Sequence, residues 1–168
     1  MKRILIMGCA GCGKSTLAKE LGQILSLPVY HLDVYYWQPG WVETEKEEFI
    51  AKQKEILATD EWIIDGNYRS TLDLRLERAD YIIFLDYRRG VALRGIIKRY
   101  FKYRNKTRDS ITIGCDEKID RDFIKWVWNF KRDAKPILVQ KIKEHPEIPV
   151  VFFKKRRDLK KYLTELKK

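Results

Sequence analysis

Residues Gly8–Ser15, with the sequence GCAGCGKS, constrain the fold of this chain more than any other segment. They match the pattern G-x-x-x-x-G-K-[ST], which forms a phosphate-binding loop between a strand and a helix. The apolar run Arg3–Met7 precedes the motif and predicts a buried strand, and apolar residues at helical spacing follow it over Lys14–Leu25. Strand, glycine loop and helix therefore occur in the order that the motif requires.

The chemistry of this loop follows from its residue types. Gly8 and Gly13 permit backbone conformations that a Cβ forbids, so successive N–H groups can point at phosphate oxygens. Lys14 brings a positive charge to the β- and γ-phosphates, Ser15 brings a hydroxyl for Mg²⁺, and the helix N-terminus attracts anions. We therefore expect a nucleoside triphosphate to bind at nine consecutive residues: Gly8, Cys9, Ala10, Gly11, Cys12, Gly13, Lys14, Ser15 and Thr16.

Length and composition limit the class of protein. A chain of 168 residues has the size of one domain with a sizeable core, so we expect a single domain over residues 1–168. No apolar run approaches the length of a membrane span. Three cysteines and a first strand close to Met1 predict a cytoplasmic protein without a signal peptide or a disulfide framework.

Apolar runs that alternate with helical patterns predict the architecture. Five strands are expected, at Arg3–Met7, Pro28–Leu32, Trp62–Ile64, Tyr81–Leu85 and Val150–Phe153. Five helices are expected, at Lys14–Leu25, Thr44–Ala58, Arg89–Lys102, Asp120–Glu144 and Arg157–Leu166. This alternation is typical of an α/β protein with a parallel sheet and helices on both faces. The polar, basic stretch over residues 103–120 lacks periodicity and predicts a mobile loop or lid.

Carboxylates follow three of the expected strands, at the sheet edge where open α/β folds bind ligands. Asp65 has the position of a second Mg²⁺ anchor, and Asp86 competes for that role; Gly66, which permits close approach of a ligand, favours Asp65. Asp33 can orient or deprotonate an acceptor hydroxyl. Each carboxylate can instead belong to a turn or cap a helix. The aromatic residues near Asp33 form an acceptor pocket or cover the core: Tyr35, Tyr36, Trp37 and Trp41.

Positive charge is concentrated in the middle of the chain. The net charge is +11, and the segment from Arg88 to Arg108 holds nine Lys or Arg and no Asp or Glu. Helical spacing places Arg94, Lys98 and Lys102 on one face. These cations can stabilise a transferring phosphoryl group as the lid closes, or form a solvated basic face.

Cys9 and Cys12 form a C-x-x-C pair inside the phosphate loop. A helix N-terminus can lower the pKa of Cys12 and make this thiol sensitive to oxidation. A zinc site needs four ligands, and Cys115 with two scattered histidines does not complete a set, so no zinc is expected.

The sequence favours ATP over GTP. A GTPase needs Asn-Lys-x-Asp after a strand, whereas the segment Asn105–Arg108 lacks the Asp and lies in the expected lid. A short chain with a lid and post-strand carboxylates is typical of a small-molecule kinase that uses ATP and Mg²⁺.

Eight segments carry a family resemblance: Gly8–Thr16, Val29–Asp33, Pro39–Trp41, Trp62–Tyr68, Lys102–Arg104, Lys106–Arg108, Gly114–Cys115 and Phe123–Phe130. In these segments the chain resembles the adenylate-kinase-like bacterial DNA topology modulation proteins (the FlaR family), almost from end to end. The resemblance implies a three-layer P-loop nucleoside triphosphate hydrolase fold whose five-stranded parallel sheet has the strand order 2-3-1-4-5.

A wider resemblance is to the adenylate kinases. The segment Asp65–Arg69 resembles their Asp-Gly-Phe-Pro-Arg, which implies that Asp65 lies near Mg²⁺ and that Arg69 holds an acceptor phosphate. This chain has Asn67-Tyr68 in place of Phe-Pro, so AMP does not follow as the acceptor. By position, three further arginines resemble those that flank the lid of these kinases: Arg94 and Arg99 before it and Arg132 after it.

We therefore expect an ATP-dependent phosphotransferase acting on a small hydroxyl or phosphate acceptor, such as a nucleoside or nucleotide. The expected catalytic residues are Lys14, Asp33, Arg69, Arg94, Arg99 and Arg132, and the expected Mg²⁺ partners are Ser15 and Asp65. The competing class is an ATP-binding regulator that associates with DNA and affects its topology, although no DNA-reading pattern is evident. No membrane partner is expected, and the oligomeric state stays open.

Overall fold

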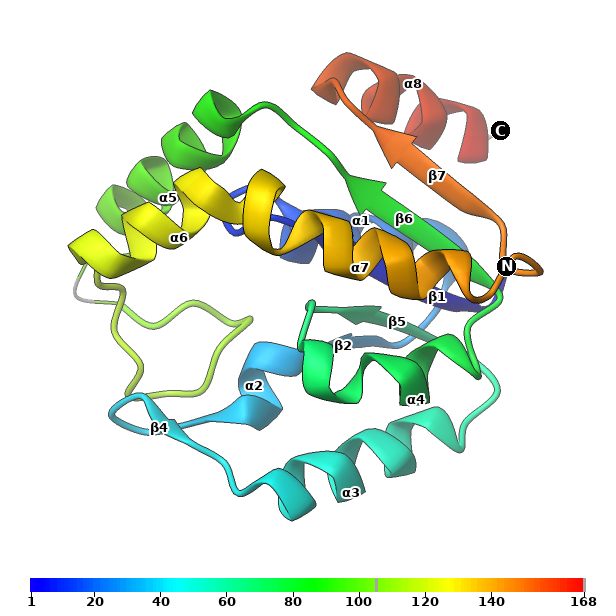
Figure 1. Cartoon of the computed structure of the whole chain (residues 1–168), viewed down its shortest axis with the longest axis horizontal. Helices are drawn as coiled ribbons and strands as arrows, with labels where there is room; N and C mark the ends of the chain where they lie inside the picture. Colours follow the sequence, from blue (N-terminus) through cyan, green and yellow to red (C-terminus); the bar gives the residue numbers. More distant parts are fainter. Residues whose placement is uncertain (105, 168) are drawn as a thin grey trace.

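The computed structural model describes residues 1–104 and 106–167. A five-stranded parallel sheet forms its centre (Figure 1). The strands are β1 (Arg3–Gly8), β2 (Val29–His31), β5 (Trp62–Asp65), β6 (Tyr81–Leu85) and β7 (Val150–Phe153). Their order across the sheet is β2-β5-β1-β6-β7. When the two short strands outside this sheet are left out of the count, the order is 2-3-1-4-5, and the predicted fold class is confirmed.

Helices cover both faces of the sheet. They are α1 (Lys14–Leu25), α2 (Leu32–Tyr36), α3 (Lys46–Leu57), α4 (Leu72–Leu76), α5 (Arg89–Tyr103), α6 (Arg121–Asp133), α7 (Lys135–Lys143) and α8 (Arg156–Leu166). In the view of Figure 1, α7 crosses in front of the sheet and α1 lies behind it. None of the helices in the described part of the chain is long and apolar enough to cross a membrane.

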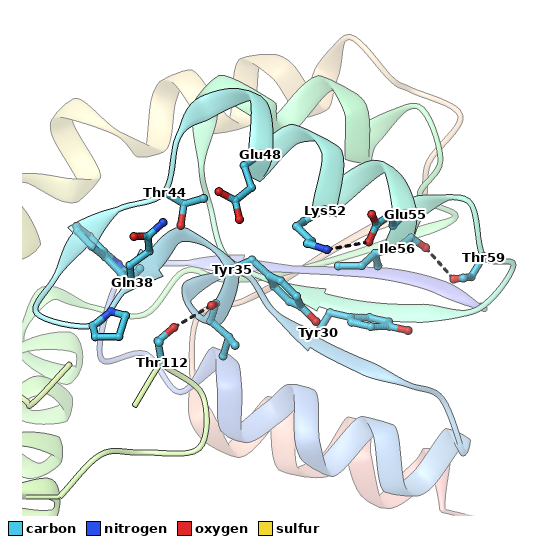
Figure 2. A pocket seen from close by; sticks show the side chains of 13 residues that line it. Tyr30, Tyr35, Gln38, Thr44, Glu48, Lys52, Glu55, Ile56, Thr59 and Thr112 are labelled. Carbon is cyan, nitrogen blue, oxygen red and sulfur yellow. Dashed lines mark hydrogen bonds and ion pairs between the residues drawn. The ribbon is translucent and has the colours of Figure 1, made fainter. Parts of the chain in front are cut away.

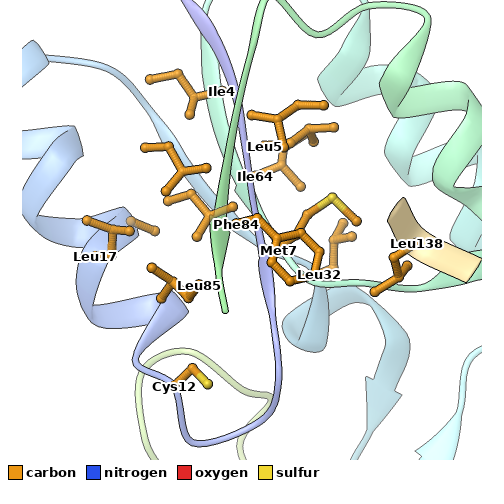
Figure 3. Packing of buried hydrophobic residues seen from close by; sticks show 14 of the residues in the cluster. Ile4, Leu5, Met7, Cys12, Leu17, Leu32, Ile64, Phe84, Leu85 and Leu138 are labelled. Carbon is orange, nitrogen blue, oxygen red and sulfur yellow. The ribbon is translucent and has the colours of Figure 1, made fainter. Parts of the chain in front are cut away.

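The core explains why the strands are apolar along their whole length. Ile4, Leu5, Ile6 and Met7 of β1 are each at most 1% exposed, because helices cover both sides of this central strand. Figure 3 shows Leu17 of α1 on one side of the strands and Leu138 of α7 on the other. Each such aliphatic side chain contributes about 1.5–3 kcal/mol when it is buried. The core therefore holds the carboxyl ends of β1, β5 and β6 at one edge.

One predicted helix is wrong in its extent. The helix expected over Asp120–Glu144 is two helices, α6 and α7, which meet at Ala134. Pro136 lies in the first turn of α7, where its missing N–H costs nothing, but it cannot continue a helix that began earlier. The proline therefore starts a new helix instead of lying inside a long one.

Several short elements were not predicted. The helix α2 follows β2 directly, and a two-stranded antiparallel hairpin follows it, formed by β3 (Trp37–Gln38) and β4 (Val42–Glu43). A 3₁₀ turn (Arg69–Thr71) leads into α4. Elements of two to five residues are too short to show a period of 2 or 3.6 in the sequence.

The expected lid corresponds to the segment between α5 and α6, of which Asn105 lies outside the described residues. The described part, residues 106–120, contains neither helix nor strand. That this segment moves as a lid, and that residues 1–168 form one domain, stay predictions.

Candidate nucleotide and acceptor site

The phosphate loop connects β1 to α1 and packs closely on α5. Gly11 has φ +75°, and a Cβ at this position would lie 2.3 Å from the carbonyl oxygen of Ala92. A Cβ on Gly95, one helical turn further along α5, would lie 1.9 Å from the carbonyl oxygen of Gly11. Two glycines thus let the backbones of the loop and the helix touch.

Asn67 fixes the start of the loop. The Gly8 N–H donates to Asn67 Oδ1 at 3.1 Å, and Asn67 Nδ2 donates to the Gly8 carbonyl at 2.9 Å. Both backbone groups at the end of β1 are therefore paired with one side chain that follows β5. Asn67 was not predicted as a site residue, although it lies in the segment Trp62–Tyr68 that carries the family resemblance.

The loop brings a hydroxyl and a carboxylate together. Ser15 Oγ donates to Asp65 Oδ2 at 2.7 Å, and His31 Nδ1 is bonded to the other oxygen of Asp65. Asp65 is 5% exposed. The described residues contain no cluster of three or more His, Cys, Asp or Glu side chains that could hold a metal alone. One hydroxyl and one carboxylate suit Mg²⁺, which keeps several waters and takes further oxygens from phosphates.

Asp86 has a different environment. Its two oxygens bind Lys131 Nζ of α6 at 3.1 Å and Lys135 Nζ of α7 at 2.7 Å, and the residue is 8% exposed. This carboxylate therefore holds the two helices to the end of β6. Ser15 meets Asp65 and not Asp86.

Lys14 lies over the loop that contains it. Its Nζ donates to the Cys9 carbonyl at 3.1 Å, and the Cys12 N–H donates to the same carbonyl at 3.3 Å. The side chain is only partly buried, so its charge lies at the surface of the loop.

Asp33, in the first turn of α2, is bound from two sides. Tyr68 donates its hydroxyl to Asp33 Oδ1 at 2.7 Å, and Arg108 Nη2 donates to Oδ2 at 3.1 Å. Burial, with the charge of Asp33, raises the pKa of Tyr68, which keeps this phenol a neutral donor. Asp33 stays 37% exposed at its side chain and can still meet a ligand.

A buried glutamate joins two arginines beside Asp33. Glu117 Oε1 lies 3.0 Å from Arg99 Nε and 3.1 Å from Arg108 Nε, and its side chain is 2% exposed. Burial lowers the pKa of Arg99. Asp33, Arg108, Glu117 and Arg99 form one chain of alternating charges, which we call the lid network. The basic segment Arg88–Arg108 therefore has acidic partners, although its own sequence contains none. They are Asp33 and Glu117, which lie outside the segment.

The lid segment packs on α2 and the hairpin. Thr112 Oγ1 donates to the Val34 carbonyl at 2.8 Å, Trp41 Nε1 to the Asp116 carbonyl at 3.0 Å, and the Gly40 N–H to the Gly114 carbonyl at 3.0 Å. These contacts, with the lid network, hold residues 108–117 over the carboxyl edge of the sheet.

Three expected arginines lie outside the lid network. Arg69, in the 3₁₀ turn, and Arg94, on α5, are exposed. Arg132 is exposed as well, and its Nη2 donates to the adjacent Asp133 at 3.0 Å. The structure therefore brings Lys14, Ser15, Asp65, Asp33 and Arg99 to one edge, and leaves these three arginines at the surface.

Arg75 was not predicted as part of the site. Its guanidinium is fully buried and donates to the carbonyls of Asn67 at 2.8 Å and Tyr68 at 2.9 Å, and to Gln53 Oε1 at 3.1 Å. These bonds hold the backbone of the two residues that bind Gly8 and Asp33. An arginine in a five-residue helix gives no sequence signal that distinguishes it from a surface arginine.

A pocket of about 520 Å³ lies between α2, the hairpin and α3 (Figure 2). Tyr35 and Trp37 line it, whereas Tyr36 packs edge-on against Phe49 and lies 4.6 Å from Tyr68, ring centre to ring centre. Tyr36 therefore packs on the core, while Tyr35 and Trp37 line a pocket. That this pocket takes an acceptor stays a prediction.

The fold and this loop define a P-loop protein with a parallel sheet and helices on both faces. The family model described as AAA domain matches residues 4–122, and the chain belongs to this family. An uncharacterised relative, YqaC of Bacillus subtilis (strain 168), is 26% identical over 151 residues, and the match covers 86% of this chain and 81% of that protein.

Solved kinase structures share the fold. A shikimate kinase from Acinetobacter baumannii in complex with shikimate has a TM-score of 0.61 at 15% identity, and covers 99% of this chain and 92% of its own. A gluconokinase from Sinorhizobium meliloti 1021 has a TM-score of 0.53 at 16% identity, with 98% and 89% covered. At such identities the likeness shows the fold alone.

Proposed function

We propose that the protein transfers the γ-phosphoryl group of ATP to a small-molecule acceptor. The observation that carries this proposal is the meeting of the phosphate loop with Asp65, beside an Asp33 that is held by Tyr68 and Arg108. A donor site and a carboxylate suited to an acceptor thus share one edge of the sheet. The kinase folds of the solved neighbours support the same reaction class.

The residues divide the work as follows. Lys14 binds the β- and γ-phosphates, while the backbone of Gly8–Thr16 surrounds them. Ser15 and Asp65 hold Mg²⁺, which neutralises charge on the phosphates. Asp33 accepts the proton of the acceptor hydroxyl or orients it. Arg99 and Arg108 bring positive charge to the transferring group, because the lid network places them next to Asp33.

The acceptor class is a small hydroxyl or phosphate compound. Nucleosides and nucleoside monophosphates follow from the resemblance to adenylate kinases, with Arg69, Arg94 and Arg132 proposed to reach a bound phosphate on closure. Small hydroxy acids follow from the neighbours, which are a shikimate kinase and a gluconokinase.

An ATP-consumption screen over these three classes tests the proposal. We expect one class to stimulate ATP use in the presence of Mg²⁺, and we expect Lys14→Ala to abolish that stimulation. Lys160→Ala, on the exposed side of α8, is the control for loss of a positive charge. A Lys14→Ala protein with undiminished activity contradicts the mechanism.

The second candidate is an ATP-binding regulator that associates with DNA, in line with the resemblance to DNA topology modulation proteins. It is favoured by the net charge of +11 and by the basic segment Arg88–Arg108. A titration with duplex DNA at two salt concentrations separates the two candidates. Tight binding with a steep salt slope, and no transfer to any acceptor, supports the regulator.

A further inference from the structure

The phosphate loop contains two thiols that the proposed transfer does not use. Cys9 and Cys12 are free, and they are 6% and 3% exposed. Cys9 Sγ donates to the Val127 carbonyl of α6 at 3.8 Å. Gly13, which follows Cys12, is exposed, and space around it is open. The pair therefore lies directly beneath the surface that the loop presents to a ligand.

The backbone holds the two cysteines at a distance that suits a disulfide. The Cys12 N–H donates to the Cys9 carbonyl at 3.3 Å, so Cys9 and Cys12 are the ends of a turn over Ala10 and Gly11. The Cα atoms at the ends of such a turn lie within about 7 Å of each other. Disulfides span Cα separations of about 4.4–6.8 Å. The two thiols are also close enough for each to shift the pKa of the other.

The two thiols differ in acidity. The neighbouring Cys9 thiol and the charge of Lys14 lower the pKa of Cys12 to about 7, against the desolvation that opposes them. The same contact and burial raise the pKa of Cys9. Cys12 is therefore the nucleophile of the pair, and Cys9 is placed to react with whatever forms on Cys12.

We propose that Cys9 and Cys12 form an oxidation site, in which a hydroperoxide converts the pair to a disulfide that holds the loop closed against phosphate. The Cys12 thiolate attacks one peroxide oxygen, the O–O bond breaks, and Cys12 becomes a sulfenic acid. Cys9 then loses its proton and attacks the Cys12 sulfur, and the S–O bond breaks with release of water. In sum, two thiols and one hydrogen peroxide give one disulfide and two waters.

The structure indicates why this disulfide opposes phosphate binding. In the turn, the Cys9 carbonyl accepts both the Cys12 N–H and the Lys14 ammonium. Both donors are of the kind that a P-loop directs at phosphate. A disulfide between the ends of the turn keeps both donors bonded to the Cys9 carbonyl, so they cannot turn toward phosphate. This part of the inference rests on the proposed nucleotide site, whereas formation of the disulfide does not.

The experiment uses the full chain with Cys115→Ser, so that only the loop thiols remain, and compares each protein with its own reduced form. Trypsin releases both loop cysteines in one peptide, Ile4–Lys14, whose mass falls by two hydrogens when the disulfide forms. We expect this loss after hydrogen peroxide and its reversal by dithiothreitol. We expect the ATP affinity of the oxidised form to fall about tenfold, since two donors are lost to phosphate, and to recover on reduction. Bound ATP should slow the oxidation.

Two variants separate the steps. Cys9→Ser should accumulate a sulfenic acid on Cys12 that dimedone traps, and Cys12→Ser should resist peroxide. Oxidation of Cys12 to a sulfinic acid without the disulfide, or a disulfide that leaves ATP affinity unchanged, overturns the proposal. A reduced protein that binds no ATP instead contradicts the proposed function, and the mass of the Ile4–Lys14 peptide still decides whether the disulfide forms.

Discussion

Asn67 shows how much of this site depends on single polar side chains. Its side-chain amide pairs with both backbone groups of Gly8, and its backbone carbonyl accepts a hydrogen bond from the buried Arg75. The position of the phosphate loop is thus connected through two side chains to the core beneath α4. Both side chains hold the backbone that leads into the phosphate loop.

We predict that Asn67→Ala weakens ATP binding about 30-fold, because Gly8 loses two hydrogen bonds worth roughly 1 kcal/mol each. Asn129→Ala, on α6, is the control, because Asn129 is partly exposed and is not in the site. Titration calorimetry with ATP measures both variants. Equal affinities for the two variants would show that Asn67 does not position the loop.

The two competing carboxylates should respond differently to neutralisation. We predict that Asp65→Asn raises the Mg²⁺ concentration needed for half-maximal transfer at least about tenfold, because Mg²⁺ loses an anionic ligand. Asp86→Asn should instead lower the free energy of unfolding by about 1–3 kcal/mol, because Lys131 and Lys135 lose a partner to which both are bound. Mg²⁺ titrations and urea denaturation of both variants check this. A changed Mg²⁺ requirement in Asp86→Asn with none in Asp65→Asn contradicts Asp65 as the Mg²⁺ partner.

The pKa of Cys12 can be measured through its alkylation. In the folded chain the pKa of this thiol is about 7, against an ordinary value of 9.0, so the thiolate forms at a lower pH than in the unfolded chain. We predict that the rate of reaction with iodoacetamide at Cys12 rises through pH 7 when the protein is folded, and only near pH 9 in urea. Cys9→Ala should move the folded midpoint upward, since the neighbouring Cys9 thiol is the main cause of the lowered pKa. Equal midpoints for the folded and unfolded chain exclude the shift.

Helix α5 packs directly against the phosphate loop. Gly95 allows the helix backbone to touch Gly11, and Arg99, one turn further, belongs to the lid network. The same helix therefore contacts both the donor side and the acceptor side of the site.

We predict that Gly95→Ala weakens ATP binding at least about tenfold, because its Cβ would lie 1.9 Å from the Gly11 carbonyl oxygen and must displace the loop. Gly90→Ala on the same helix is the matched control, since a Cβ there meets nothing within 4 Å. Its ATP affinity should equal that of the parent protein. Fluorescence titration with a labelled ATP analogue compares the two, and a Gly95→Ala protein of full affinity refutes the contact.

Elements with a long and regular pattern could be predicted from the sequence. The bounds of α1, β6 and β7 agree with the expectation, because the 12-residue helix shows clear periodicity and the two strands are continuous apolar runs. The hairpin of β3 and β4 was not predicted, since strands of two residues show no periodicity. The break at Ala134 also escaped, although Pro136 was visible as a signal.

Across the whole molecule, the parallel sheet explains why half of the site was predictable. Motif residues such as Lys14 and post-strand carboxylates such as Asp65 and Asp33 meet because parallel strands end at one edge. Glu117 and Arg75 were not predictable as parts of the site. Both side chains are buried by contacts between segments far apart in the chain. Arg75 contacts Gln53, and Glu117 contacts Arg99. The exposed positions of Arg69, Arg94 and Arg132 likewise follow from packing and not from motif spacing.

The most direct test of the central claim follows the terminal phosphoryl group of ATP itself. ATP labelled at the γ-phosphate is incubated with the protein, Mg²⁺ and each acceptor class, and the products are separated. The label should appear in an organic phosphate of small size, only with Mg²⁺, and not with Lys14→Ala. Label that appears only as inorganic phosphate with every acceptor, or equal transfer by Lys14→Ala, would contradict a phosphotransferase built on Gly8–Ser15.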